Sequence, residues 1–125
     1  MPFTPVMPRF LPIAQPERTS RRPIAFRRFV VLPAARTLLR SGEPVEIGGR
    51  AFDMLMVLLH ARGAIVSKDE IMRQVWPTIF VEEGNLRYQM VMLRKALGAD
   101  RDLIKTVTGR GYLLIDERSD AAVLA

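Results

Sequence analysis

Side chains that present paired hydrogen-bonding groups are concentrated in the segment Glu82–Leu97. An arginine guanidinium offers two parallel N–H donors to guanine, and a glutamine amide pairs in a similar way with adenine. Lysine contacts phosphate oxygens, and valine can pack on a thymine methyl group. The candidates for such contacts with DNA are Arg87, Gln89, Val91, Arg94 and Lys95. Each is equally compatible with a solvated helix face, because amphipathic surface helices display such residues.

A second group of candidates lies in the segment 106–112, TVTGRGY. Gly109 and Gly111 permit positive φ in a turn and leave Arg110 as its projecting side chain. Hydroxyl groups suited to phosphate oxygens belong to Thr106, Thr108 and Tyr112. Phosphate contacts position a protein on DNA but carry no sequence information directly. The segment therefore predicts a turn that contacts the DNA backbone or minor groove.

A helix followed by a hairpin must position these two groups. Four apolar residues recur at helical spacing and are expected to face inward: Leu86, Met90, Leu93 and Leu97. Glutamates at the start of this segment and basic residues at its end both suit the helix dipole. The sequence thus predicts a helix over Glu82–Leu97, ended by Gly98. The runs LIKTV and YLLI predict an antiparallel hairpin within Leu103–Ile115.

The preceding residues predict a small antiparallel sheet and two further helices. Ser67 and Glu70 have the spacing of a capping box, with reciprocal bonds between each side chain and the other residue's backbone amide. The expected strands are Ile24–Leu32, Arg36–Arg40 and Val45–Ile47, with a turn at Ser41–Pro44. The expected helices are Ala51–Ala61, ended by Gly63, and Lys68 to Val75 or Trp76, stopped by Pro77.

Charge and proline content divide the chain into a domain with two tails. Residues 1–28 contain six arginines and one glutamate, whereas the rest of the chain is nearly neutral within a total of +6. Five prolines lie in the first 20 residues. We therefore expect a flexible Pro/Arg-rich tail at 1–22, a folded domain at 23–116 and a flexible tail at 117–125. The first tail is either a basic arm that contacts DNA or a solvated leader.

Composition argues against catalysis and against a membrane location. The chain has no cysteine and a single histidine, His60, so neither a metal cluster nor a catalytic triad is expected. No glycine loop has the spacing of a phosphate-binding motif. No apolar run is long enough for a membrane span. We expect a cytoplasmic protein that is not an enzyme and that uses no metal or cofactor.

A helix pair followed by a hairpin predicts a winged helix-turn-helix in the α+β class. The segments GGRAFDMLMVLL, VSKDEIMRQVW, VEEGNLRYQMVMLRKALG and TVTGRGY resemble the winged-helix effector domain of OmpR/PhoB-type bacterial response regulators, over roughly Ile24–Ile115. The resemblance implies an N-terminal antiparallel sheet, three helices and a hairpin wing at Leu103–Ile115. It further implies that the helix Glu82–Leu97 enters the major groove, and that the loop Pro77–Val81 can contact RNA polymerase.

The chain departs from this family in two respects. The segment before the domain is too short for a receiver domain, so phosphorylation by a partner kinase is not expected. In this family the helix that enters the major groove often carries a basic pair in its middle. This chain has Val91 and Met92 at those positions, and we expect both side chains to be exposed. In the polymerase-facing loop, represented by Thr78, Ile79 and Phe80, we expect one of the two apolar residues to pack beside Trp76.

Two functional hypotheses remain open at this point. The first is a sequence-specific transcriptional regulator that binds double-stranded DNA, as a dimer or tandem pair on repeated half-sites, in association with the nucleoid. The second is an adaptor that uses the same scaffold to bind RNA polymerase or another regulator, with weak DNA contact.

Overall fold

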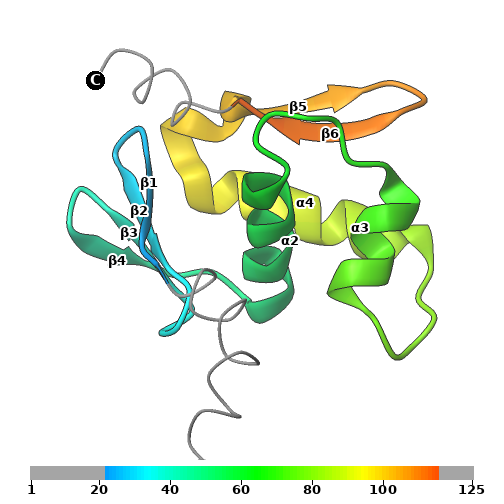
Figure 1. Cartoon of the computed structure of the whole chain (residues 1–125), viewed down its shortest axis with the longest axis horizontal. Coiled ribbons are helices and arrows are strands. Elements are labelled where there is room, and N and C mark those ends of the chain that lie inside the picture. The colour runs from blue at the N-terminus through cyan, green and yellow to red at the C-terminus, as the bar shows by residue number, and fades with distance from the viewer. Residues whose placement is uncertain (1–21, 116–125) are drawn as a thin grey trace, which may run out of the picture.

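The computed structural model describes residues 22–115, so nearly all of both predicted tails lies outside the described residues. The strands are β1 (Ile24–Phe26), β2 (Phe29–Leu32), β3 (Thr37–Arg40), β4 (Glu43–Val45), β5 (Ile104–Val107) and β6 (Gly111–Leu114). The helices are α2 (Gly49–His60), α3 (Lys68–Val75), α4 (Glu83–Leu97) and the short 3₁₀ helix η1 (Gly98–Leu103). This is the predicted α+β winged helix-turn-helix, with an N-terminal sheet, three α-helices and a C-terminal hairpin (Figure 1).

The N-terminal sheet is an antiparallel meander in the order β1-β2-β3-β4. The single strand predicted over Ile24–Leu32 is wrong, because the chain reverses at Arg27, which has φ of 51°, and pairs Phe26 with Phe29. Both phenylalanines are buried, and their rings stack with centroids 5.1 Å apart. Packing of this aromatic pair on the core favours the reversal, although the turn contains no glycine.

The second hairpin is tighter than predicted. The residues Ser41 and Gly42 both have positive φ and make the turn by themselves. Glu43 and Pro44 therefore belong to β4 rather than to the turn, and Ile47 follows this strand. Proline is tolerated there because β4 is an edge strand, where an N–H donor is not needed for a ladder bond.

The helices confirm the predicted order, with small shifts at their ends. Ser67 caps α3, since its Oγ accepts a hydrogen bond from the Glu70 backbone N–H at 3.1 Å. The reciprocal half of the predicted capping box is not formed. The Glu70 carboxylate instead accepts from the side chains of Arg73 and Gln74 one turn further along α3.

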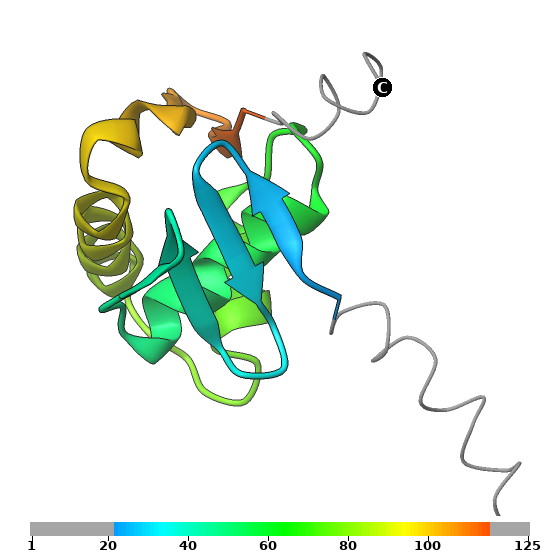
Figure 2. The ribbon, with the colours of Figure 1, turned by 90° about the vertical axis from the view of Figure 1, so that its left-hand side faces the viewer.

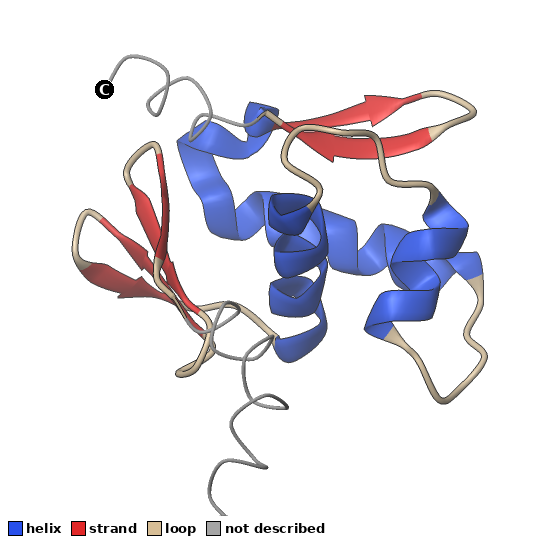
Figure 3. Cartoon of the chain, viewed as in Figure 1, coloured by secondary structure: helices blue, strands red, loops and turns tan. Residues whose placement is uncertain are grey.

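The core lies where α2 meets the sheet on one side and α3 and α4 on the other. Figure 2 shows the four strands covering α2, and Figure 3 shows α4 crossing behind it towards α3. Apolar side chains from every layer meet there, including Leu38 of β3, Leu55 of α2, Ile71 of α3 and Leu93 of α4, all at 0% exposure. The orientation of α4 therefore depends on packing against three other elements.

The wing is attached to the helices by a backbone bridge between Val66 and Tyr112. Val66, in the loop before α3, exchanges two hydrogen bonds with Tyr112: its N–H donates to the Tyr112 carbonyl at 2.8 Å, and its carbonyl accepts from the Tyr112 N–H at 3.0 Å. Gly111 lies directly against this bridge with φ of 143°. A Cβ atom at Gly111 would lie 2.0 Å from the Val66 carbonyl oxygen.

Gly111→Ala is therefore expected to destabilise the domain by roughly 3 kcal/mol, because it combines a steric clash with an unfavourable backbone conformation. Gly109→Ala is the matched control. Gly109 also has positive φ, of 77°, but open space surrounds its Cβ position, so we expect a loss of only about 1 kcal/mol. Urea unfolding followed by circular dichroism measures both, and equal losses would show that the approach to Val66 is unimportant.

Candidate nucleic-acid interface

One face of α4 is buried and the opposite face is open. The buried face consists of Leu86, Met90, Leu93, Ala96 and Leu97, which confirms the predicted inward-facing positions. Because successive residues of a helix are rotated by about 100°, residues spaced by three or four share a face. The residues on the open side, which we call the exposed stripe, are Gly84, Arg87, Tyr88, Val91 and Lys95.

The exposed stripe brings together three of the five helix residues predicted to contact DNA: Arg87, Val91 and Lys95. Val91 lies near the middle of the stripe and is 60% exposed. Tyr88 also lies on the stripe at 60% exposure, and sequence reasoning missed it as a site residue. The helical spacing of Tyr88 from Val91 and Lys95 was sufficient to find it.

Gln89 lies on a different side of α4 from the exposed stripe. It lies about 160° around the helix from Val91 and is half-buried, so it does not share the exposed stripe. Its amide is thus turned away from the partner that the stripe would face. Met92 also differs from expectation, because it is half-buried and packs against the core.

At the start of α4, Glu83 joins two cations. Its Oε2 accepts from Lys68 Nζ at 2.7 Å and from Arg87 Nη1 at 3.1 Å. The Lys68 hydrogen bond and charge, with Arg87 adding to them, lower the pKa of the exposed Glu83 carboxyl. The same pair raises the pKa of Lys68. The cluster links the first residue of α3 to the first turn of α4 and orients Arg87.

Arg94 contacts the wing rather than standing free. Its Nη2 donates to the Ile104 carbonyl at 3.0 Å and to Thr106 Oγ1 at 2.9 Å. Its guanidinium carbon lies 5.9 Å from the centre of the Tyr112 ring. Arg94 therefore connects the last turn of α4 to both strands of the hairpin.

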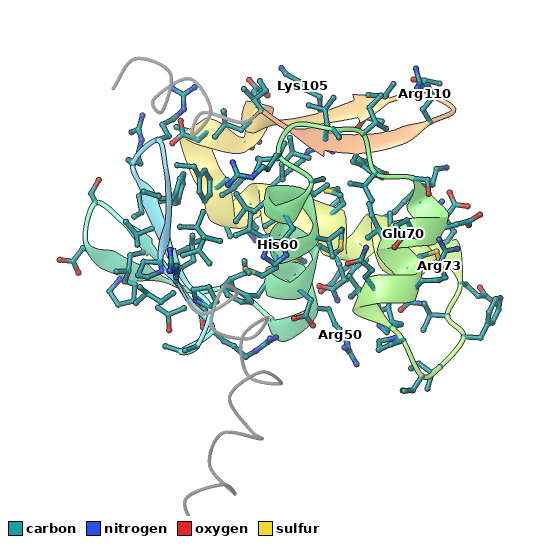
Figure 4. The ribbon with its side chains drawn as sticks, in the orientation of Figure 1. Arg50, His60, Glu70, Arg73, Lys105 and Arg110 are labelled. Atoms are coloured by element: carbon teal, nitrogen blue, oxygen red, sulfur yellow. The ribbon has the colours of Figure 1, made fainter. Side chains whose placement is uncertain are left out.

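The wing presents three of its four predicted residues to solvent: Thr106, Thr108 and Arg110. Figure 4 shows Arg110 at the tip of the hairpin and Lys105 along it. Tyr112 is different, because it is 7% exposed and belongs to the hydrophobic core. This buried position does not favour the predicted phosphate contact by Tyr112. The side chain instead packs in the core under the hairpin.

A groove of about 510 Å³ separates the end of α4 from β5. Its lining contains the basic residues Arg94, Lys95, Arg101 and Lys105, with Asp102 as the single acidic residue. Val91 and Thr106 complete the connection to the exposed stripe and the wing. The space between the end of α4 and β5 therefore has an excess of positive charge.

The loop between α3 and α4 presents apolar side chains on another part of the surface. Trp76 is buried as expected, but Ile79 and Phe80 are 59% and 92% exposed, so the expectation that one of them packs inside was wrong. Thr78 is also exposed. These loop residues and Trp76 border a mainly apolar groove of about 220 Å³.

Residues 22–115 offer neither a metal-binding cluster nor a membrane-spanning helix. This part of the chain contains no group of three or more histidine, aspartate or glutamate side chains arranged to hold a metal ion. None of its helices has the length and apolar character needed to cross a membrane.

Curated proteins similar to this chain are transcriptional regulators. Transcriptional regulator HilA of Salmonella typhimurium is 34% identical over 112 residues, covering 85% of this chain and 19% of HilA. The phosphate regulon transcriptional regulatory protein PhoB of Escherichia coli is 31% identical over 84 residues, covering 64% of this chain and 36% of PhoB. The chain thus spans about a fifth of HilA and about a third of PhoB.

Solved structures show the same fold. The DNA-binding domain of Escherichia coli CadC matches with a TM-score of 0.67 and 28% identity, over 76% of this chain and 94% of that domain. The Klebsiella pneumoniae RstA DNA-binding domain, solved in complex with the RstA box, gives 0.66 and 26%, over 76% and 98%. Residues 42–114 match the family described as "Transcriptional regulatory protein, C terminal". This chain therefore belongs to that family, the OmpR/PhoB-type winged-helix DNA-binding domains.

Proposed function

We propose that this chain is the sequence-specific DNA-binding part of a transcriptional regulator, with α4 in the major groove and the wing on the neighbouring backbone or minor groove. The observation that carries the proposal is the continuity of the exposed stripe of α4 with the basic groove beside β5. HilA and PhoB, named as transcriptional regulators, support the regulatory role. The RstA domain, solved with the RstA box, supports the DNA partner.

The dimensions of α4 suit this role. Its 15 residues span roughly 22 Å at about 1.5 Å per residue, and the major groove is about 12 Å wide and admits one helix. The stripe would face the base edges along this length. Arg87 is the side chain best placed for a bidentate contact with guanine, once released from or shared with Glu83.

The DNA backbone contacts are assigned to residues on either side of the stripe. Lys95 lies on α4, Lys105 on β5, and Arg110 at the tip of the wing, and all three are exposed. Exposed Thr106 and Thr108 add hydroxyl groups along the same hairpin. Because Thr106 Oγ1 accepts from Arg94, its own hydrogen is left to donate to a phosphate oxygen.

Arg94 acts in this proposal by positioning the wing rather than by reading a base. Its Nη2 is already engaged by two acceptors, the Ile104 carbonyl and the Thr106 hydroxyl. Those bonds fix the wing relative to α4, so the helix and hairpin reach DNA at a set separation. This assignment replaces the direct base contact that sequence analysis favoured for Arg94.

Pairing of two domains on repeated half-sites follows from the small size of the interface. A single module of this kind buries little DNA surface, whereas linked binding of two modules multiplies the affinity. We therefore propose a homodimer or tandem pair as the DNA-bound form. Nucleoid association in the cytoplasm would follow from DNA binding itself.

The loop Pro77–Val81 supports a second contact, with a protein. Ile79 and Phe80 are exposed beside an apolar groove, and exposed apolar patches of this kind mark interaction sites. In Figure 1 this loop lies on the side of the molecule away from the wing. We propose that it contacts RNA polymerase while α4 and the wing bind DNA.

Selection from a random duplex pool at ~150 mM salt should enrich a shared repeated motif. Arg110→Ala should weaken binding to enriched and unrelated duplexes by a similar factor and reduce the salt slope by about 1, because one phosphate contact is lost. Fluorescence anisotropy across a salt series measures both. Arg50→Gln is the control, since Figure 4 places Arg50 far from the wing. Recovery of random fragments alone would contradict the proposed function.

Arg94→Ala should lower the free energy of unfolding by about 1–3 kcal/mol, because two charge-assisted hydrogen bonds are lost and their acceptors are left behind. Affinity for the enriched motif should fall, while the order of preference among single-base variants of that motif stays unchanged. Exposed Lys95→Ala serves as the control and should change stability by less than about 0.5 kcal/mol. Relaxed preference at one base position would instead return Arg94 to the base-reading residues.

Phe80→Ser should reduce transcription from the cognate promoter severalfold and leave the affinity for DNA unchanged, because the polar side chain removes apolar surface from the loop only. A reporter assay and anisotropy measure the two quantities. Phe80→Leu keeps an apolar side chain and should retain most of the activity. Unchanged transcription with Phe80→Ser would remove the loop from the proposed polymerase contact.

A further inference from the structure

The centre of the exposed stripe is apolar, although it belongs to the helix that is proposed to face a polyanion. Among residues 22–115, the exposed large apolar side chains are Ile79, Phe80, Tyr88 and Val91. Two of them lie in the loop before α4, and the other two lie three residues apart on α4. Tyr88 and Val91 therefore form one small apolar patch on the stripe, which we call the apolar centre.

Basic residues surround the apolar centre. Arg87 adjoins Tyr88 on α4, Lys95 follows Val91 by one turn, and the basic groove begins at Val91 itself. An apolar patch with a cationic border is complementary to the major groove, where phosphates line the walls and base edges form the floor. Among the groups that the four base pairs present on this floor, the alkyl group is the thymine C5-methyl.

We propose that Val91, with Tyr88 beside it, contacts and thereby recognises thymine methyl groups. This inference rests on the proposed entry of α4 into the major groove. The half-site then has thymine beneath the middle of α4. Contact with a methyl group removes apolar surface from water on both partners. Guanine or cytosine at that position offers no methyl group to the valine side chain, which has neither donor nor acceptor with which to bond their polar groups instead.

This contact discriminates through the methyl group. Burial of one methyl-sized group is worth about fourfold in affinity. Polar groups on the edges of both A·T and G·C pairs are left without a partner by valine, so their desolvation does not separate the two. Tyr88 contributes its ring to the same apolar surface and its hydroxyl to a neighbouring acceptor.

Replacement of thymine by deoxyuridine isolates the proposed contact, since it removes the C5-methyl group and keeps base pairing. We expect this change at one or two positions of the enriched half-site to weaken binding of the full chain about fourfold at each. In Val91→Ala the thymine and deoxyuridine duplexes should bind with nearly equal affinity, because the contacting side chain is gone.

Ile79→Ala is the matched control. Ile79 is 59% exposed, against 60% for Val91, and lies in the loop rather than on the stripe. It loses similar apolar surface, and the control should keep the full difference between thymine and deoxyuridine. Because both residues are exposed, neither variant should change the urea midpoint appreciably.

Val91→Arg provides a gain-of-specificity test. Selection with this variant should replace thymine by guanine at the same position, because an arginine pairs with O6 and N7. The absence of any enriched motif with the unaltered protein would count against the proposed function itself. An enriched motif whose affinity is insensitive to deoxyuridine at every thymine, and unaltered in Val91→Ala, would overturn this inference while leaving DNA binding intact.

Discussion

Burial of one face of α4 is the interaction on which the remaining geometry depends. Leu86, Leu93 and Leu97 are completely inaccessible, and Met90 is nearly so. Each such side chain contributes about 1.5–3 kcal/mol relative to exposure, so rotation of α4 would be costly. The helix consequently has one possible orientation, and the residues of the exposed stripe are determined by those that are buried.

The N-terminal sheet and the wing act as supports for the end of α4. Arg40 of β3 donates to the Ala96 carbonyl at 2.7 Å and lies over the Phe29 ring, which satisfies a carbonyl in the last turn of α4. The turn between β1 and β2 contributes Arg28, whose Nε lies 2.8 Å from the buried Asp100 carboxylate in η1. These contacts join strands at the start of the domain to the helix far along the chain, while Arg94 joins that helix to the wing.

Sequence periodicity predicted the helices and their buried faces well, because that information is local. The stripe could also have been drawn correctly from the same spacing, which places Tyr88 with Val91 and separates Gln89 from both. The turn at Arg27 gave no such signal, since positive φ there depends on the packing of Phe26 and Phe29 rather than on a glycine. The burial of Tyr112 was likewise inaccessible to local reasoning, because it follows from pairing with Val66 in a distant loop.

The charge distribution of the domain favours the proposed DNA-facing side. Several carboxylates are paired within the fold, such as Asp53 with Arg36 and Arg50, and Asp100 with Arg27 and Arg28. Their field at the DNA-facing side is thereby reduced, and the described residues 22–115 carry a net charge of +6, from 15 basic and nine acidic side chains. Three of these cations, Lys95, Lys105 and Arg110, are assigned to phosphates in the proposed interface, and so few phosphate contacts mean limited attraction to arbitrary DNA. Affinity must then come from the base edges and from pairing of domains, so an apolar centre in the reader is compatible with high specificity.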